Sequence, residues 1–236
     1  MTLLRDRQVE LPYVQSRWLL REAAGGLTVT DDVSGVILTA TGSPVLGLTS
    51  MCKGDSYTCA SGGYASGTPS GFTASSVNVN LVNGITLEAV VAADPKAGAG
   101  NIIAIGGVAS LEISLNYVSF TVTIGGTSEA FGSTMSPLSG WPQLVHGTYD
   151  PVSQTQCLYL DGVLQSQGSR SGATATSETS VSLLTGSSNS VIQAQDVAVY
   201  NGPLSANRVL EHFNAFGQVW YDPAHVLSYT PIGVTQ

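Results

Sequence analysis

Residues 145–164, VHGTYDPVSQTQCLYLDGVL, contain two turn signals between segments of strand-forming residues. Asp150 precedes a proline, and Asp-Pro favours a type I turn because Asp bonds to the turn backbone and Pro fixes φ. Asp161 precedes Gly162, and Asp-Gly flanked by strand residues is the strongest short signal for a β-hairpin. The segment therefore predicts antiparallel strands connected by tight turns.

The same two aspartates could instead be the acid and base of an enzyme. They lie at opposite ends of the strand expected over residues 152–160, about 25 Å apart at about 3.3 Å per residue. Two carboxylates that act on one bond must lie far closer. Glu88 and Glu112 are single acids on other expected strands, where we expect them to face solvent. We therefore predict no catalytic residues and a protein that is not an enzyme.

Apolar and polar residues alternate with period two in many further segments, which is the mark of strands with one buried face. Residues 85–91 and 117–124 are the clearest examples. Turn residues separate these segments at short intervals, so we predict an all-β, two-layer antiparallel β-sandwich. Residues 42–76 are rich in Gly and Ser, and we expect one long loop or several short loops there.

One helix is expected near the end of the chain, over residues 205–217. Ser205 is a good N-cap, and Gly217 is placed to end the helix. The apolar residues expected on one face of this helix are Val209, Leu210, Phe213 and Phe216. That face must pack on the sandwich, because the chain offers it no other helix.

Composition excludes several classes of partner. The net charge is −8 and no basic patch offsets it, so we expect no nucleic-acid binding. No segment has 18 uninterrupted apolar residues, so no membrane-spanning helix is expected. Residues 1–13 carry charges where a signal peptide has its apolar core, so we expect synthesis in the cytoplasm without a secretory signal.

No metal or other cofactor is predicted. The three histidines of the chain are His146, His212 and His225. They follow no zinc-binding spacing, and we interpret His146 as a structural residue. Asp31, Asp32 or Asp55 could meet calcium on surface loops, but no D-x-D-x-D-G pattern supports this. Cys52 and Cys59 either form a small disulfide loop or remain free thiols.

Five pieces of sequence occur in a particular order along the chain. They are Trp18, Leu20, Glu22, Gly25, Asp32 and Gly35; ITLEAVV at 85–91; Trp141 with LV at 144–145; GTYD at 147–150 with LYLDG at 158–162; and DVAVYNGPLSANRVLEHFNAFG at 196–217. This order resembles the laminin-G-like, concanavalin A-like jelly-roll domains over residues 17–217. Gln195-Asp196 departs from an Asp-Glu pair that helps some members hold structure or calcium, which puts a calcium site in doubt.

The resemblance divides the chain into an N-terminal arm, residues 1–16, a jelly-roll domain, residues 17–217, and an extended tail, residues 218–236. Apolar and aromatic side chains in a tail are costly in water, so we expect the tails to dock on the domain or on another subunit. The expected assembly contacts are Arg5, Arg7, Trp220, Tyr221 and Tyr229.

Two tyrosines are candidates for sugar binding. Tyr57 and Tyr64 lie in the Gly/Ser-rich segment with Asp55 nearby. A sugar ring can stack on an aromatic face while polar groups bond its hydroxyls. The alternative is that both rings fill space in loop packing.

These features together resemble virion proteins of tailed bacteriophages, which often carry laminin-G-like domains. We expect a non-enzymatic structural protein of a virion, a minor tail or head-decoration protein. Its expected partners are other virion proteins or copies of itself in a homo-oligomer, and glycans of the host surface. The alternative is a carbohydrate-binding module of a bacterial surface or secreted protein.

Overall fold

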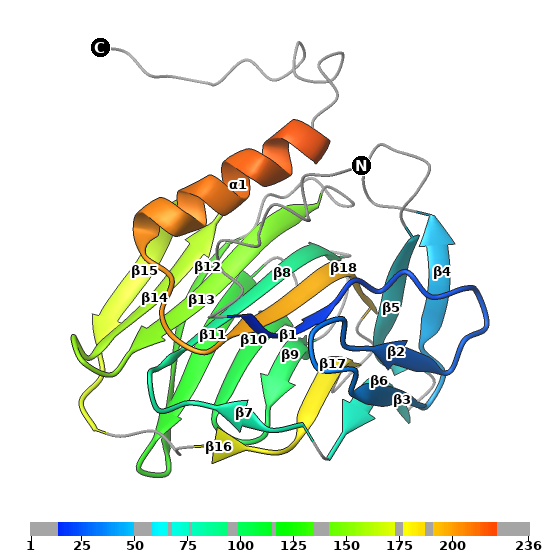
Figure 1. Ribbon diagram of the computed structural model, residues 1–236, viewed down its shortest axis with the longest axis horizontal. Helices are drawn as coiled ribbons and strands as arrows, with labels where there is room; N and C mark the ends of the chain where they lie inside the picture. The colour runs from blue at the N-terminus through cyan, green and yellow to red at the C-terminus, as the bar shows by residue number, and fades with distance from the viewer. Residues whose placement is uncertain are drawn as a thin grey trace.

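The computed structural model describes residues 14–49, 58–65, 68–75, 77–93, 99–114, 117–134, 142–172, 177–186 and 191–220. Backbone hydrogen bonds connect sixteen strands into one continuous sheet. The sheet folds over between β5 and β6, so that its two halves face each other as two layers (Figure 1). The prediction of a two-layer antiparallel β-sandwich with one helix is therefore confirmed. In the described residues no helix is long and apolar enough to cross a membrane.

The first layer, here layer A, has the strand order β2-β3-β6-β17-β9-β10-β11-β12. Its strands are β2 (Thr28–Thr30), β3 (Ile37–Thr41), β6 (Thr68–Ala74), β17 (Val181–Gly186), β9 (Ala99–Ile105), β10 (Ala109–Ser114), β11 (Tyr117–Ile124) and β12 (Thr127–Thr134). A separate two-stranded sheet pairs β7 (Val79–Asn80) with β16 (Ser177–Glu178).

The second layer, layer B, has the order β4-β5-β18-β8-β13-β14-β15, and β1 pairs with β18. Its strands are β1 (Val14–Trp18), β4 (Val45–Thr49), β5 (Thr58–Ala65), β18 (Val191–Tyr200), β8 (Ile85–Ala93), β13 (Gln143–Asp150), β14 (Thr155–Leu160) and β15 (Val163–Ser169). The core lies between the layers. Phe120 of β11 packs against Gly147 of β13, where an added Cβ would lie 2.3 Å from the ring.

Both aspartates of the opening segment are turn residues, as predicted. Asp150 accepts hydrogen bonds from the Val152 N–H at 2.8 Å and from the Ser153 hydroxyl at 2.7 Å. Asp161 and Gly162 have φ values of 50° and 79°, as the tight β14–β15 hairpin requires. The two side chains lie at opposite ends of β14.

The structure corrects the prediction for residues 42–76, which contain β4, β5 and β6 rather than a long loop. Glycine is needed here for close packing between strands. A Cβ at Gly62 would lie 2.3 Å from the Leu184 carbonyl oxygen, and one at Gly71 would lie 2.5 Å from the Leu183 carbonyl oxygen. The Gly and Ser content of this segment therefore reflects close contact between strands, although a loop has a similar composition.

Helix α1 (Ala206–Trp220) lies along the outer face of layer B (Figure 1). Ser205 is its N-cap as predicted, since its hydroxyl accepts from the Arg208 N–H at 3.4 Å. The predicted end at Gly217 is wrong, because one glycine weakens a helix by only about 1 kcal/mol relative to Ala and does not stop it. Leu210 is also 45% exposed, so the buried face is narrower than predicted.

The predicted domain limits, 1–16, 17–217 and 218–236, stay predictions. Strand β1 begins at Val14, so any deletion of the N-terminal arm has to stop before that residue to leave the sandwich intact. Cys52 lies outside the described residues, and its pairing with Cys59 stays open. Cys157 is a buried free thiol.

Candidate functional site

A row of small side chains crosses the outer face of layer A. Strand register places seven residues opposite one another on consecutive strands: Thr39, Thr73, Ser182, Ala104, Ser110, Thr121 and Ala130. For the first six of these residues, the neighbours in sequence point the other way, into the core or against it, as strand geometry requires. With strands about 4.8 Å apart, the row extends over roughly 29 Å. Five of its seven members carry a hydroxyl.

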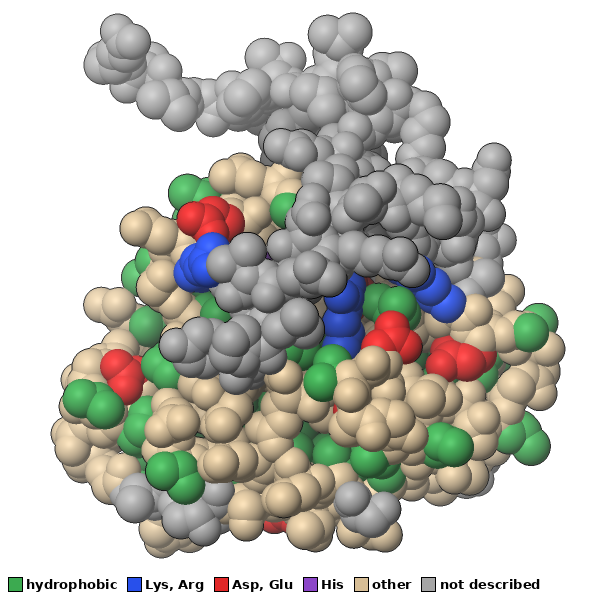
Figure 2. All heavy atoms as spheres, viewed as in Figure 1, with side chains coloured by type: hydrophobic (Ala, Val, Ile, Leu, Met, Phe, Trp, Pro, Cys, Tyr) green, Lys and Arg blue, Asp and Glu red, His purple; other side chains and the backbone are tan. Residues whose placement is uncertain are grey.

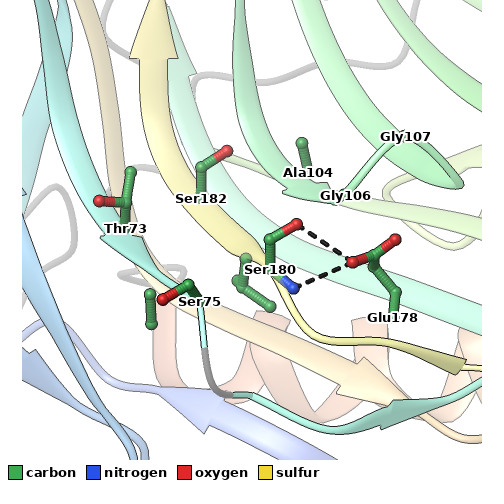
Figure 3. A pocket seen from close by; sticks show the side chains of 10 residues that line it. Thr73, Ser75, Ala104, Gly106, Gly107, Glu178, Ser180 and Ser182 are labelled. Atoms are coloured by element: carbon green, nitrogen blue, oxygen red, sulfur yellow. Dashed lines mark hydrogen bonds between the residues drawn. The ribbon is translucent and has the colours of Figure 1, made fainter.

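The row runs through a solvent-open groove of about 530 Å³ over β6, β9 and β17 (Figure 3). Thr73, Ser182 and Ala104 lie across its floor. The remaining lining residues are Ala74, Ser75, Gly106, Gly107, Glu178, Ser180 and Val181. The groove is therefore lined mainly by hydroxyls and small apolar groups.

Among the described residues that line the groove, Glu178 is the one with a charged side chain. Its carboxylate accepts a hydrogen bond from the Thr179 N–H at 2.8 Å. It also accepts from the Ser180 N–H at 3.1 Å and from the Ser180 hydroxyl at 3.2 Å (Figure 3). These bonds, led by those from the two backbone N–H groups, lower the pKa of Glu178. The groove therefore carries a fixed negative charge at neutral pH.

The Glu178 side chain lies directly against the turn that follows β9. A Cβ added to Gly106 would lie 2.2 Å from the carboxyl carbon of Glu178, and Gly106 has a φ of +50°. Glycine at this position therefore allows the carboxylate to reach the groove wall.

The lining chemistry suits reversible binding of a hydroxyl-rich ligand. Each Ser or Thr hydroxyl can both donate and accept a hydrogen bond. Among the lining residues there is no second carboxylate to act with Glu178, and no histidine to activate a serine. They also include no aromatic ring, so a ligand would be held by hydrogen bonds and apolar contact rather than by stacking.

Of the predicted sugar-binding residues, Tyr64 is not among the described residues that line this groove. Asp55 and Tyr57 lie outside the described residues, so the prediction for them is untested. Tyr64 lies in strand β5 rather than in the expected loop. Sequence alternation marked Thr121 as outward-facing, but it could not show which strands of the layer are neighbours.

The predicted assembly contacts also stay predictions. Arg5, Arg7, Tyr221 and Tyr229 lie outside the described residues. Trp220 is the last residue of α1. The described surface carries few charges, and in the view of Figure 2 most of them lie as neighbouring positive and negative side chains among uncharged ones.

Of the candidate calcium acids, Asp31 has other partners, Asp32 is exposed in the β2–β3 turn, and Asp55 lies outside the described residues. Asp31 accepts hydrogen bonds from the N–H groups of Arg17, at 2.8 Å, and Val33, at 2.9 Å. Asp196 forms a two-point ion pair with the Arg17 guanidinium, with distances of 3.2 and 3.0 Å. These acids therefore fasten β1, β18 and the β2–β3 turn together.

One buried polar cluster lies on the other side of the molecule, under α1. Glu88 is 1% exposed, so the prediction that it faces solvent is wrong: α1 covers the outward face of β8. Its carboxylate meets His146 and His212, and these three residues together could hold a metal ion. No spacing motif marks these three residues in the sequence, because they come from two strands and a helix.

The fold is a two-layer antiparallel β-sandwich with an open groove on layer A and a helix on layer B. Comparison of the sequence with protein-family models and with curated proteins gives no match. Solved structures with a similar fold are binding domains of botulinum neurotoxins.

A structure of botulinum neurotoxin type C, whose cell entry is dependent upon interaction with two ganglioside molecules, has a TM-score of 0.68 at 10% identity; the match covers 90% of this chain and 53% of that one. The binding domain of botulinum neurotoxin DC in complex with SialylT has a TM-score of 0.66 at 10% identity, covering 87% of this chain and 52% of that one. The same domain in complex with rat synaptotagmin II gives the same four values. This chain spans about half the length of these structures, and the likeness shows the fold alone.

Proposed function

We propose that this chain is a non-catalytic, lectin-like recognition module of a bacteriophage virion, and that the groove over β6, β9 and β17 binds a host-surface glycan. The observation that carries the proposal is the hydroxyl row of layer A, which widens into a groove with a single carboxylate. Saccharides present the matching pattern of closely spaced donors and acceptors.

The negative charge of the groove restricts the class of glycan that we expect it to bind. Glu178 is ionised, and the groove lining contains no Lys or Arg to attract an anion. The groove therefore favours neutral or amino sugars over sialylated ones. The neurotoxin structures with this fold that interact with gangliosides or form a complex with SialylT support a glycan-binding role for the fold. The groove chemistry of this chain predicts a different sugar.

The virion assignment rests on the sequence. An acidic chain with few charges and aromatic tail residues suits a minor tail or head-decoration protein that assembles with other virion proteins or with itself. In this arrangement the tails attach the module to the particle and the sandwich presents its groove to the host. A carbohydrate-binding module of a bacterial secreted protein would bind sugar in the same way but would have no particle.

A blocking variant tests the groove. Ser182→Trp places a large ring on the groove floor without entering the core, since Ser182 faces outward. The Trp ring should block hydrogen bonds between the groove and the glycan. If the blocked bonds together contribute about 1.4 kcal/mol, binding weakens about tenfold. Val163→Trp is the matched control, because Val163 is 58% exposed on β15 of layer B. Binding to immobilised host polysaccharides is measured for both variants, and equal affinity in Ser182→Trp and the unmutated chain would exclude this groove.

A deletion tests the virion role separately. Removing residues 1–13 leaves β1 intact, because that strand begins at Val14. We expect the deleted chain to fold and bind glycan but to be missing from purified particles, as measured by mass spectrometry. Unchanged incorporation would show that the arm has no part in assembly, and absence of the full chain from any particle would favour the secreted module.

A further inference from the structure

A buried cluster of four residues connects layer B to the terminal helix. Glu88 of β8 and His146 of β13 are direct partners in strand register. Tyr200 of β18 joins them on the same face of the layer, and His212 reaches down from α1. Each of these residues is at most 6% exposed.

One carboxylate oxygen is the meeting point of the cluster. Glu88 Oε2 lies 3.1 Å from His146 Nε2 and 2.6 Å from His212 Nδ1, and it accepts a hydrogen bond from the Tyr200 hydroxyl at 3.0 Å. The carboxylate and imidazole ligand atoms all lie within 4.8 Å of one another. The two imidazole rings are tilted by 49°, with centroids 5.7 Å apart, so both edges face the carboxylate.

Apolar side chains surround the cluster. Val90, Leu144 and Phe216 pack as one apolar group between layer B and α1, and Cys157, Tyr159 and Val209 belong to a second apolar group on the same face. Burying a carboxylate is unfavourable unless it is paired or bound to a metal ion. A divalent cation neutralises Glu88 while both imidazoles remain neutral ligands.

We propose that Glu88, His146 and His212 form a binding site for a divalent transition-metal ion of the zinc type, with Tyr200 holding the carboxylate in place. Bonds of about 2.0–2.1 Å to a tetrahedral zinc ion place ligand atoms about 3.4 Å apart. The observed 2.6 and 3.1 Å contacts then open by less than about 1 Å when the ion enters. Two imidazole nitrogens and one carboxylate suit zinc or its neighbours, whereas calcium and magnesium require more oxygen ligands.

The site would act as a structural clamp. It takes ligands from β8, β13 and α1, and His212 is separated from Glu88 by 124 positions in the sequence. A bound ion therefore fixes the helix on the outer face of layer B. This role is independent of the glycan groove, which lies on the outer face of layer A.

Zinc titration of the full chain, after removal of metal by a chelator, tests the site directly. Competition with a coloured chelator should show one equivalent of zinc bound. At a free zinc concentration 100 times the Kd, thermal unfolding should shift upward by roughly 5–10 °C. No uptake of zinc by the unmutated chain would overturn the proposal and leave the cluster as a hydrogen-bonded network only.

Variants then assign the ligands. His146→Asn and His212→Asn should each weaken zinc binding about 100-fold or more, and Tyr200→Phe about tenfold, since groups that orient a ligand typically contribute 10–100-fold. His225→Asn is the matched control, because it removes the one histidine outside the cluster. Zinc affinity that persists in His212→Asn, or falls in His225→Asn, would refute the site.

A second measurement covers the case in which these variants do not fold. Cobalt added to the unmutated chain should give the strong visible absorption of a tetrahedral site, and zinc should displace it. Weak absorption typical of a six-coordinate, water-rich ion would contradict the proposed ligand set.

Discussion

Replacing Glu88 with alanine removes the common acceptor of the buried cluster. His146, His212 and Tyr200 each lose a hydrogen bond of 3.1, 2.6 and 3.0 Å, respectively, in a site closed to water. Leaving a buried polar group without its hydrogen-bond acceptor costs about 1–3 kcal/mol, so we expect the three losses together to cost about 3–5 kcal/mol. For a chain of 236 residues this corresponds to a fall in Tm of roughly 6–20 °C.

Urea unfolding in the presence of a metal chelator measures this cost without any contribution from bound metal. Glu112→Ala is the matched control, because Glu112 is a half-buried acid of layer A that accepts one hydrogen bond, from the Ser110 hydroxyl at 2.6 Å. Its loss should cost about 1 kcal/mol or less. If Glu88→Ala were as mild as Glu112→Ala, the cluster would not hold α1 in place, and the clamp argument would fail.

Two further substitutions probe the core and the hairpin. Gly147→Ala places a Cβ 2.3 Å from the Phe120 ring, so the layers must separate, and urea unfolding should show a loss of about 1–3 kcal/mol; an unchanged midpoint would contradict the close layer contact. Asp161→Asn keeps the turn preference for Asn-Gly but removes a carboxyl whose pKa burial raises, an effect partly offset by hydrogen bonds from Gln143 and the Leu144 N–H. With a raised pKa, the folded state binds the Asp161 proton more tightly than the unfolded state does. This stabilisation is present in acid and is lost as pH rises through the raised pKa. As the pH rises from 3 to 7, the free energy of unfolding of Asp161→Asn should therefore increase relative to that of the unmutated chain. A pH-independent difference would be evidence against a desolvated Asp161.

Local sequence signals predicted the elements whose causes are local. The Asp161-Gly162 turn, the alternating strands over 85–91 and 117–124 and the Ser205 cap depend on a few neighbouring residues, and all are present in the structure. The same reasoning placed Glu88 in solvent, because alternation separates two faces of a strand without showing what covers each face. Helix α1 covers the outer face of β8, and that contact spans more than a hundred residues.

The Gly- and Ser-rich segment, residues 42–76, shows a second limit of prediction from local sequence. Gly62 and Gly71 look like loop residues in a single sequence, yet both lie in strands against the carbonyl groups of β17. Small residues at a strand crossing and small residues in a turn give the same composition. Only the register of β5, β6 and β17 distinguishes them, and register is a long-range property.

The two outer faces of the sandwich have opposite characters. The proposed glycan groove lies on one face, and the proposed clamp that holds α1 lies on the other. The outer face of layer A is an open row of hydroxyls around Ser182, while that of layer B is closed by α1 over Glu88. Packed sheets lie about 10 Å apart, so the two sites are too distant to share contacts, and their mutational effects should add. Ser182→Trp should therefore weaken glycan binding in the Glu88→Gln background by the same factor as in the unmutated chain, when both are measured well below their melting temperatures. A different factor would show that the helix clamp and the groove are coupled through the core, and the module could no longer be treated as a rigid scaffold with independent faces.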